Sequence, residues 1–461
     1  MTHNLPIHVV ILAAGKGTRM KSSLPKVLHP VAGRPMLEHV LRAARRVRPE
    51  SLTVVVGHEG ETIRSAFKHQ RDVSFVVQEP QLGTAHALLQ AEPALRTAKG
   101  DLVLVYGDVP LLTGQTLAAL VERHRVEAST ATVVTAVVDQ PYGYGRIVRR
   151  EGQLLRIVEE RDASPGERAI KEINAGLYAF ALPPLFDAIR SVAPQNAQGE
   201  YYLPDVIGVY RRRSLGVSTL TVADPDEIRG VNSRSELAEV SNLVRQKKNE
   251  ELMAAGVTLI DPATTYVDVD VVVGADTVLH PNVYLEGSTV IGAACEIQAG
   301  TRLVNARVGD RVTIRNYCVI TDSTVADEAV IGPFAHLRPA SEVGEGAHIG
   351  NFVELKKTKV GRGSKASHLT YLGDATIGAN ANIGAGTITC NYDGTQKHAT
   401  IIGDGAFIGS DSQLVAPVRV GDGAYVAAGS TIVDDVPAGA LGIARGKQVN
   451  KEGWVEKKKG Q

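Results

Sequence analysis

A glycine-rich segment with two cations near the N-terminus could bind a phosphorylated substrate. Gly15 and Gly17 follow a short aliphatic run, and Arg19 and Lys26 come soon after them. Small residues after a strand let backbone N–H groups approach phosphate oxygens closely, and the two cationic side chains suit a triphosphate. On the glycines alone, a tight strand-to-helix turn explains the segment equally well.

This segment differs from two familiar nucleotide-binding loops. Val10 stands where a Walker A loop needs its first glycine. Met20 stands where the dinucleotide-binding fingerprint needs its third glycine. The segment therefore indicates phosphate binding of another kind.

Several other polar residues have plain structural interpretations when each is taken alone. Asp108, two residues before Pro110, suits a turn at a strand end. Glu159 suits a solvated charge, and Lys356 suits an outward-facing residue of a repeat. His368 could act as a general base near neutral pH, as some histidines do. A joint pattern is needed to assign these residues roles.

The second half of the chain repeats aliphatic residues at intervals of six. One series runs from Val273 to Leu355 with two slips of one residue, and another runs from Ile402 to Ile432. A hexapeptide period predicts a parallel β-helix, in which stacked coils bury an aliphatic ladder. Residues 361–376 and 385–401 interrupt the period. We expect these two stretches to be protruding insertions that bind ligands, because solenoid insertions often do.

The first half alternates short aliphatic runs with helical patterns. This alternation predicts an α/β domain with a mainly parallel sheet covered on both faces, whose ligands bind at the carboxyl ends of the strands. A helix over 235–255 is predicted to link the halves, with Gly256 as its stop signal. The expected domains are residues 1–234 and 256–461. The expected strands are 7–12, 52–56, 73–77, 102–106 and 131–137, and the expected helices include 35–46 and 84–96.

Composition and charge exclude several classes of protein. The chain has 461 residues, with 50 Lys and Arg against 50 Asp and Glu, so nothing suggests a bulk nucleic-acid binder. Its three cysteines have no metal-ligand spacing and fit a reducing cytoplasm. The sequence shows no signal-peptide pattern and no apolar run of membrane-spanning length. We therefore expect a cytoplasmic location.

Further strings in the first half complete a recognisable pattern. The loop from Leu12 to Met20, followed by Leu24-Pro25-Lys26, resembles the signature of sugar-1-phosphate nucleotidyltransferases. Later matching strings occur in the expected order at Gln78–Ala85, Tyr106–Pro110, Gly143–Ile147, Ile157–Glu160, Glu172–Gly176 and Gly230–Asn232. With the hexapeptide half added, essentially the whole chain resembles the bifunctional bacterial enzymes that make UDP-N-acetylglucosamine. The resemblance implies a Rossmann-like nucleotidyltransferase domain followed by a left-handed β-helix.

The resemblance implies a uridylyltransferase site in the first half, with UTP as co-substrate and Mg²⁺ as cofactor. Arg19 and Lys26 would face the phosphates, and Asp108 and Asn232 would hold the metal. Gly145, Glu159 and Asn174 would contact the sugar. The remaining residues implied to bind UTP or the UDP-sugar are Leu12, Ala13, Ala14, Gly15, Gln78, Gly83, Thr84, Tyr106 and Gly107.

The resemblance implies an acetyltransferase site in the second half, where His368 would deprotonate the sugar amine that attacks acetyl-CoA. Arg338, Lys356, Tyr371 and Asn382 would bind the acceptor sugar phosphate. The residues implied to bind acetyl-CoA are Ala385, Asn391, Tyr392, Ser410, Ala428 and Arg445. After Arg445 the chain continues Gly446-Lys447, where the family more often has an apolar residue.

The expected reactions are acetylation of glucosamine-1-phosphate and then uridylyl transfer from UTP to N-acetylglucosamine-1-phosphate. The product would feed peptidoglycan and lipid-linked envelope sugars, including lipopolysaccharide, from the cytoplasm. A homotrimer is expected, with only small molecules as other partners and neither nucleic acid nor membrane. Two alternatives are a nucleotidyltransferase whose β-helix is a non-catalytic oligomerising scaffold, and a regulatory subunit without catalysis.

Overall fold

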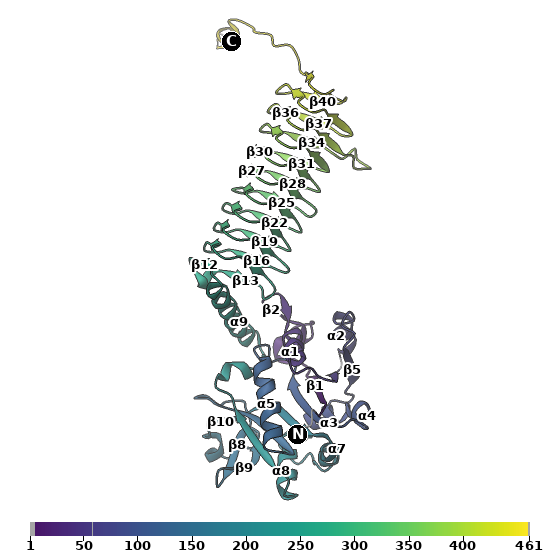
Figure 1. Ribbon diagram of the computed structural model, residues 1–461, viewed down its shortest axis with the longest axis vertical. Helices are drawn as coiled ribbons and strands as arrows, with labels where there is room; N and C mark the ends of the chain where they lie inside the picture. The colour runs from purple at the N-terminus through teal and green to yellow at the C-terminus, as the bar shows by residue number, and fades with distance from the viewer. Residues whose placement is uncertain (1–4, 58, 460–461) are drawn as a thin grey trace. The chain divides into compact units, whose positions relative to one another are not determined.

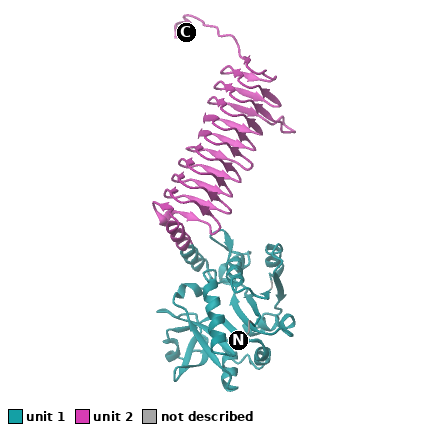
Figure 2. Ribbon diagram, in the orientation of Figure 1, with its two compact units in different colours: residues 1–244 teal, residues 245–461 magenta. Residues whose placement is uncertain are grey.

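The computed structural model describes residues 5–57 and 59–459, which form two compact units divided at residues 244 and 245 (Figure 2). Each unit is treated separately. The boundary lies inside the long helix α9 (Arg234–Ala254), so the helix predicted over 235–255 is present and belongs to both units. No helix of the described ranges is long and apolar enough to cross a bilayer.

The first unit is built on a mixed sheet in the order β11-β7-β10-β6-β1-β4-β5, with β8 and β9 attached to β10. Its pairs are parallel except where β10 meets β6, β7 and β8 and where β8 meets β9. The strands are β1 (Ile7–Ala13), β4 (Ser51–Val56), β5 (Val73–Val77), β6 (Asp101–Tyr106), β7 (Ala131–Val137), β8 (Arg146–Arg150), β9 (Gln153–Val158), β10 (Glu172–Ala181) and β11 (Val217–Thr221), beside the hairpin β2 (Pro30–Val31) and β3 (Arg34–Pro35). The mainly parallel sheet is thus confirmed.

Both faces of this sheet are covered by helices, and the side chains of β1 point alternately into the two buried clusters. Val9 and Ile11 belong to one buried cluster, and Val10 and Leu12 belong to the other. A strand whose two faces are both buried is typical of a parallel α/β sheet. The helices are α1 (Met36–Arg45), α2 (Gly60–Ala66), α3 (Thr84–Leu89), α4 (Glu92–Leu95), α5 (Gly114–Val126), α6 (Pro165–Arg168), α7 (Leu182–Arg190) and α8 (Asp205–Arg212), with 3₁₀ turns η1 (Thr18–Met20), η2 (Lys26–Leu28) and η3 (Pro225–Ile228).

The single helix predicted over 84–96 is wrong. The chain forms α3, a break at Gln90 and Ala91, and then α4. Pro93 lies in the first turn of α4, where a missing backbone N–H costs nothing, whereas inside one continuous helix it would remove a hydrogen bond.

The second unit is a left-handed parallel β-helix whose coils stack along one axis (Figure 1). Its first sheet contains β12 (Thr258–Leu259), β15 (Val278–Leu279), β18 (Glu296–Ile297), β21 (Thr313–Ile314), β24 (Val330–Ile331), β27 (His348–Asn351), β30 (Lys365–His368), β33 (Asn382–Ile383), β36 (Phe407–Ile408), β39 (Tyr425–Val426) and β41 (Leu441–Gly442). Its second sheet contains β13 (Tyr266–Val267), β16 (Tyr284–Glu286), β19 (Arg302–Val304), β22 (Val319–Thr321), β25 (His336–Leu337), β28 (Glu354–Lys356), β31 (Tyr371–Gly373), β34 (Ile388–Cys390), β37 (Gln413–Val415) and β40 (Thr431–Ile432). Its third sheet contains β14 (Val272–Val273), β17 (Val290–Ile291), β20 (Arg307–Val308), β23 (Thr324–Val325), β26 (Glu342–Val343), β29 (Lys359–Val360), β32 (Ala375–Ile377), β35 (Thr400–Ile402) and β38 (Val418–Val420). The tail ends in α10 (Trp454–Lys459), and η4 spans Pro262–Thr264.

The aliphatic ladder points inward throughout. Val273, Leu355, Ile402 and Ile432 are all buried, as are the members of the series between them. Coils of two lengths share one register, because Val272 pairs with Val290, 18 residues on, and Val290 pairs with Arg307, 17 residues on. The slips of one residue in the sequence are therefore shorter coils.

Asp side chains close one corner of several coils. The carboxylate of Asp310 accepts a hydrogen bond from the backbone N–H of Ala293 in the coil below, at 2.8 Å. Asp327 accepts from Asp310, and Asp404 accepts from Ala379, in the same way. These bonds satisfy backbone donors at the turn that the strands leave unpaired.

The prediction that residues 361–376 form an insertion is wrong. This stretch is an ordinary coil, in which β30, β31 and β32 pair with the coils on both sides. Its inward positions are Ala366, Leu372 and Ile377, all buried. The small alanine and the interval of five from Leu372 to Ile377 hid the repeat.

The second interruption holds a genuine excursion, which is shorter than expected. Residues 391–399 leave the coil between β34 and β35, and Tyr392 and Lys397 face each other in an isolated bridge. The carboxylate of Asp393 accepts hydrogen bonds from the backbone N–H groups of Thr395 and Gln396 and from the ring of His398. These bonds, the one to Gln396 foremost, hold the pKa of Asp393 well below its usual value, so the loop is closed around a carboxylate.

Candidate active sites

A cavity of about 1300 Å³ opens at the carboxyl ends of β1, β4, β5 and β6 in the first unit. These strands are parallel, so the loops that follow them meet at one edge of the sheet. The predicted residues that line this cavity are Leu12, Ala13, Ala14, Gly15, Lys26, Gln78, Gly83, Thr84, Tyr106, Asp108 and Asn232.

The ammonium group of Lys26 joins two oxygens at the floor of the cavity. It forms an ion pair with the carboxylate of Asp108 and donates a hydrogen bond to the amide oxygen of Asn232 at 3.0 Å. Asp108 follows β6 and Asn232 precedes α9, and the backbone N–H of Val231 donates to the carbonyl of Asp108 at 2.9 Å. A cation already occupies the point where these oxygens converge.

Asp108 and Asn232 also suit a hard metal ion. A carboxylate and an amide oxygen are ligands that Mg²⁺ accepts when phosphates and water complete its shell. Within residues 5–57 and 59–459, no group of three or more His, Cys, Asp or Glu side chains could hold a metal ion. A site with two protein oxygens is therefore the arrangement that the chain offers.

Gly145, Glu159 and Asn174 lie close together: Gly145 directly precedes β8, Glu159 directly follows β9, and Asn174 lies on β10. A Cβ atom added to Gly145 would lie 3.1 Å from Oε1 of Glu159 and 3.5 Å from Cβ of Asn174. The Asn174 backbone N–H donates to the Gly145 carbonyl at 2.9 Å. Tyr106 lines the cavity, and burial, followed by the nearby carboxylates of Glu159 and Asp108, raises the pKa of its hydroxyl group.

Glu159 is held as a weak acid. Burial, and then the carboxylates of Asp205 and Asp162, raise the pKa of its carboxyl group to about 7, against the opposing effect of Arg146. Arg146 is itself buried and forms an ion pair with Glu160 at 2.5 Å. A carboxyl group that titrates near neutral pH beside a ligand cavity is typical of functional sites.

Glu200, which the sequence analysis did not single out, lines the cavity, and the residues after it pack against Gly83 and Thr84. Gly83 has φ of +106°, and a Cβ there would lie 2.7 Å from the carbonyl oxygen of Tyr201. Thr84 accepts a hydrogen bond from the N–H of Leu203 at 3.0 Å, and Gln78 donates to the Gly83 carbonyl at 2.9 Å. Glycine is needed here because the two backbones touch.

Besides the cluster of Gly145, Glu159 and Asn174, two further predicted residues lie outside the cavity lining. Gly107 packs inward, where a Cβ atom would meet Ala13, Val27 and Leu37 at 3.3 Å each, so it allows close packing behind the site. Arg19 is exposed on η1, and its contact with phosphate stays a prediction.

In the second unit, His368 lies at the corner between the first and second sheets. It ends β30, where it pairs in register with Asn351 of β27. Its Nδ1 lies 2.7 Å from the amide oxygen of Asn351. The side chain is exposed, so its other ring nitrogen can reach a substrate.

Arg338, Lys356 and Tyr371 come together on the second sheet. Leu337 pairs with Leu355, so Arg338 and Lys356 follow at equivalent places in neighbouring coils. Arg338 forms an ion pair with Glu354 at 2.9 Å, and Glu354 pairs with Tyr371 of the next coil. Asn382 does not join this group, because it lies on the first sheet in register with Lys365.

Lys397, which the sequence analysis missed, is brought to Lys356 by the excursion. The Lys356 carbonyl accepts from the N–H of Asp374 at 2.9 Å, and Asp374 accepts from the side chain of Asn391 at 2.5 Å. Contact with Lys356 lowers the pKa of Lys397. Two ammonium groups in contact favour an anion between them.

The predicted acetyl-CoA residues form one column and one loop. The column follows the corner of successive coils beyond His368. The carbonyl of Ala385 accepts from the N–H of Asp411 at 2.7 Å, and that of Ser410 accepts from the N–H of Gly429 at 2.8 Å. The carbonyl of Ala428 accepts from the Arg445 guanidinium at 2.8 Å. Gly386 N–H donates to Leu369, the residue after His368, at 3.2 Å. Asn391 and Tyr392 instead lie on the excursion at the far side of the second sheet.

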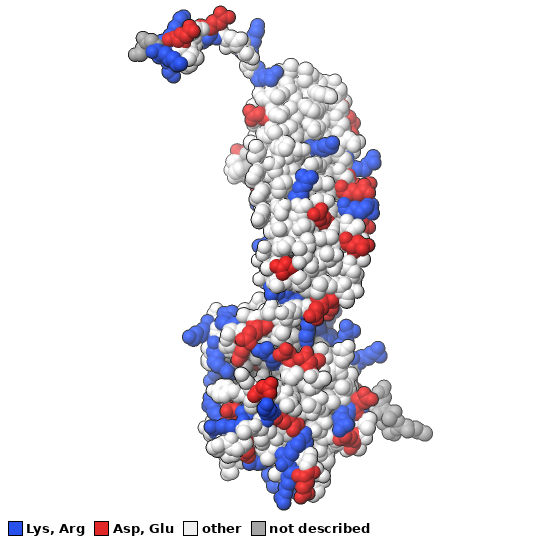
Figure 3. All heavy atoms as spheres, turned by 90° about the vertical axis from the view of Figure 1, so that its left-hand side faces the viewer, with Lys and Arg blue, Asp and Glu red and all other residues white. Residues whose placement is uncertain are grey.

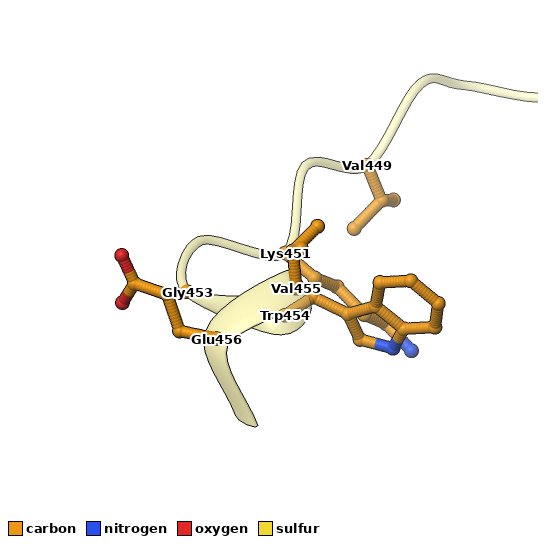
Figure 4. A pocket seen from close by; sticks show the side chains of 6 residues that line it. All are labelled: Val449, Lys451, Gly453, Trp454, Val455 and Glu456. Carbon is orange, nitrogen blue, oxygen red and sulfur yellow. The ribbon is translucent and has the colours of Figure 1, made fainter. Parts of the chain in front are cut away.

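A second hollow, of about 490 Å³, lies in the C-terminal tail (Figure 4). Its lining contains none of the predicted site residues. It is formed by Val449, Lys451, Gly453, Trp454, Val455 and Glu456.

Family models match both halves of the chain. A MobA-like NTP transferase domain matches residues 9–177, a GMPPB C-terminal domain matches residues 263–360, and the bacterial transferase hexapeptide with six repeats matches residues 399–434. The first match covers the sheet that carries the cavity, and the others lie in the β-helix.

Curated proteins match the chain from end to end. The Bifunctional protein GlmU of Pelobacter propionicus is 50% identical over 449 residues, which cover 97% of this chain and 98% of that protein. Those of Geotalea uraniireducens and Brevibacillus brevis are each 51% identical over 98% of this chain, covering 99% and 97% of their own lengths. The chain therefore belongs to the bifunctional GlmU family, and the prediction of an enzyme that joins a uridylyltransferase to an N-acetyltransferase is confirmed.

Proposed function

We propose that the second unit acetylates glucosamine-1-phosphate with acetyl-CoA, and that the first unit then converts the product with UTP to UDP-N-acetylglucosamine and pyrophosphate. The observation that supports this assignment most directly is that each unit brings together most of the residues predicted for its own reaction. The proposal includes Mg²⁺ as cofactor and the cytoplasm as location.

Uridylyl transfer requires positioning and charge neutralisation more than a covalent intermediate. An oxygen of the sugar phosphate attacks the α-phosphorus of UTP, and pyrophosphate leaves. Lys26 would shift from Asp108 toward the phosphates, and Arg19 would approach from η1. Mg²⁺ held by Asp108 and Asn232 would neutralise phosphate charge. The cluster of Gly145, Glu159 and Asn174 would orient the sugar.

Acetyl transfer requires a base, because an ammonium group cannot attack a thioester. His368 would accept the proton from the sugar amine, and the nitrogen would attack the acetyl carbonyl. The C–S bond then breaks, and His368 returns the proton to the departing sulfur, so that coenzyme A leaves as the thiol. Arg338, Lys356 and Lys397 would hold the phosphate, while the column from Ala385 to Arg445 would place the thioester above the base.

A homotrimer is part of the proposal, and two features of the β-helix support it. Tyr317, Phe334 and Phe352 stack on one corner with centroids 5.3 and 5.2 Å apart, and they are 57%, 46% and 55% exposed. A further copy would bury these rings. The second feature is the position of Asn382 on the first sheet, apart from Arg338, Lys356 and Tyr371. In a trimer, Asn382 of one copy would contribute to the phosphate site of its neighbour. A sedimentation mass of one chain would overturn the trimer.

The other expected partners are small molecules only. On the face shown in Figure 3, positive and negative side chains are interspersed. Such a surface lacks the single-sign stripe on which nucleic acids bind.

The decisive experiment measures thiol release from acetyl-CoA with glucosamine-1-phosphate in the absence of UTP. Release that depends on the sugar phosphate would support the acetyltransferase assignment, and pyrophosphate release from UTP with N-acetylglucosamine-1-phosphate would support the other half. Folded protein that releases pyrophosphate and no thiol would make the β-helix a scaffold.

A further inference from the structure

Asn351 is the polar neighbour that orients the ring of His368. The two residues face each other across adjacent coils, and Asn351 also accepts a backbone hydrogen bond from the N–H of Leu369 at 3.0 Å. On the other side, the hydroxyl of Thr370 donates to the carbonyl of His368 at 2.7 Å. The backbone and the ring of the histidine are therefore both fixed from the coil.

The contact between the side chains selects one tautomer. The amide oxygen of Asn351 can only accept, so Nδ1 of His368 carries the hydrogen and donates it across 2.7 Å. The exposed Nε2 then keeps its lone pair. That lone pair is what a general base needs.

We propose that Asn351 is a positioning residue for acetyl transfer, which presents Nε2 of His368 as a base and does so without a charge. This inference rests on the proposed role of His368. A carboxylate at position 351 would fix the same tautomer but would also stabilise the imidazolium, which is not a base.

The other ionisable groups at this corner are basic side chains. They come from each neighbouring coil element: His348 on β27, Lys365 on β30 itself, and Arg315 after β21, while β33 contributes the neutral Asn382. Burial lowers the pKa of His348, and the charges of Arg315, Lys365 and His368 lower it further. A carboxylate at position 351 would therefore introduce a negative charge next to His368 among these basic groups.

Asn316 provides a matched control. It occupies the same corner two coils below, where its carbonyl accepts from Phe334 at 3.0 Å as that of Asn351 accepts from Leu369. No ring of a proposed base follows it in the next coil. Substitutions at 316 therefore reproduce the change in the coil without the change at His368.

The experiment measures acetyl transfer by thiol release from pH 5.5 to 9 in the full-length Asn351→Asp, Asn351→Ala, Asn316→Asp and Asn316→Ala proteins. We expect Asn351→Asp to move the acidic limb of the kcat profile upward by about one pH unit. We expect Asn351→Ala to lower kcat about tenfold or more at unchanged KM for both substrates. The Asn316 variants should match the parent protein.

Two results would overturn the inference. One is an Asn351→Asp profile that superimposes on the parent profile, and the other is full kcat in Asn351→Ala. Pyrophosphate release by the first unit of each sample reports the concentration of active protein. If Asn351→Asp does not fold, Asn351→Ala decides the question. Retention of acetyl transfer by His368→Ala would instead refute the base assignment itself, and with it the proposed acetyl mechanism.

Discussion

The two candidate sites are assembled in opposite ways. In the first unit, Asp108 and Asn232 come 82 and 206 residues after Lys26 along the chain, yet all three meet in one cavity. In the second unit, Asn351 meets His368 only 17 residues later, on an open surface. The first site depends on the whole tertiary fold, whereas the second is a local product of stacking.

This difference extends to electrostatics. The enclosed site shifts the pKa of a carboxyl group to about 7, because Glu159 is buried among other acids. In the exposed β-helix site, by contrast, the pairing register of neighbouring coils brings charged side chains together, as the ion pair of Arg338 with Glu354 shows. If the sites are this distinct, each variant should damage one activity alone.

The largest effect is expected for His368→Ala. Loss of the general base should lower acetyl transfer by about 10²- to 10⁴-fold and leave uridylyl transfer unchanged. Parallel thiol and pyrophosphate assays measure both. His280→Ala is the control, since His280 lies on the β-helix and contacts Glu296 at 3.1 Å, and it belongs to neither candidate site. Loss of both activities from folded protein would contradict independent sites.

The mirror experiment is Asp108→Asn. Removing the carboxylate should lower uridylyl transfer by about 10²- to 10³-fold, because it takes away charge that positions Lys26 and would hold the metal. Acetyl transfer should persist in the same sample. Asp72→Asn, at an exposed ion pair with Arg45, serves as control. Equal pyrophosphate release by both variants would remove Asp108 from the mechanism.

Lys397→Ala should have a smaller effect, on binding. The KM for glucosamine-1-phosphate should rise about tenfold with kcat less altered, because one charge-assisted contact is lost. Lys359→Ala is the matched control, since Lys359 pairs with Glu342 on the third sheet at 3.0 Å. An unchanged KM would separate the excursion from the phosphate site.

The smallest effect concerns stability rather than rate. The pKa of Glu159 is raised from 4.5 to about 7 in the folded unit, so folded protein retains a proton that unfolded chain has released over this range. Stability from this group is therefore lost as pH rises from 4.5 to 7. Glu159→Gln should raise Tm at pH 8 by a few degrees relative to the parent and leave Tm at pH 4.5 little changed.

Glu160→Gln should act in the opposite direction. Burial raises the pKa of Glu160, but hydrogen bonds from Arg146 and from the backbone of Gly143 lower it overall. Its charged form is thus favoured in the fold, and its removal should reduce Tm at pH 8. The same sign for both variants would contradict the assignment of Glu159 as the desolvated member.

Much of the fold could be predicted from periodicity, because each pattern has a direct structural cause. The aliphatic residues from Val273 to Leu355 recur about every six residues, which is one strand of a three-stranded coil, and the members of the series are buried. The coil at 361–376 escaped because Ala366 is too small to mark an inward position by type. Pro93 marked a helix break that the apolar spacing alone concealed.

Most site residues could be predicted because they belong to sequence motifs, but their pKa values and contacts could not. The loop from Leu12 to Gly15 lines the cavity as expected. The pKa of Glu159 depends on Asp162 and Asp205, which no local pattern links to it. Lys397 reaches Lys356 through the excursion, whose turn is held by hydrogen bonds to Asp393, and sequence spacing does not define this path.

The coexistence of coils of 17 and 18 residues in one register has an evolutionary consequence. A single-residue deletion at a corner can be absorbed without moving any strand, whereas the same deletion inside a strand would turn an aliphatic side chain outward. Lineages can therefore lose or gain residues at the corners while the ladder persists. Length variation among relatives should accordingly gather at the turns, and the spacing of catalytic side chains along the axis should stay constant.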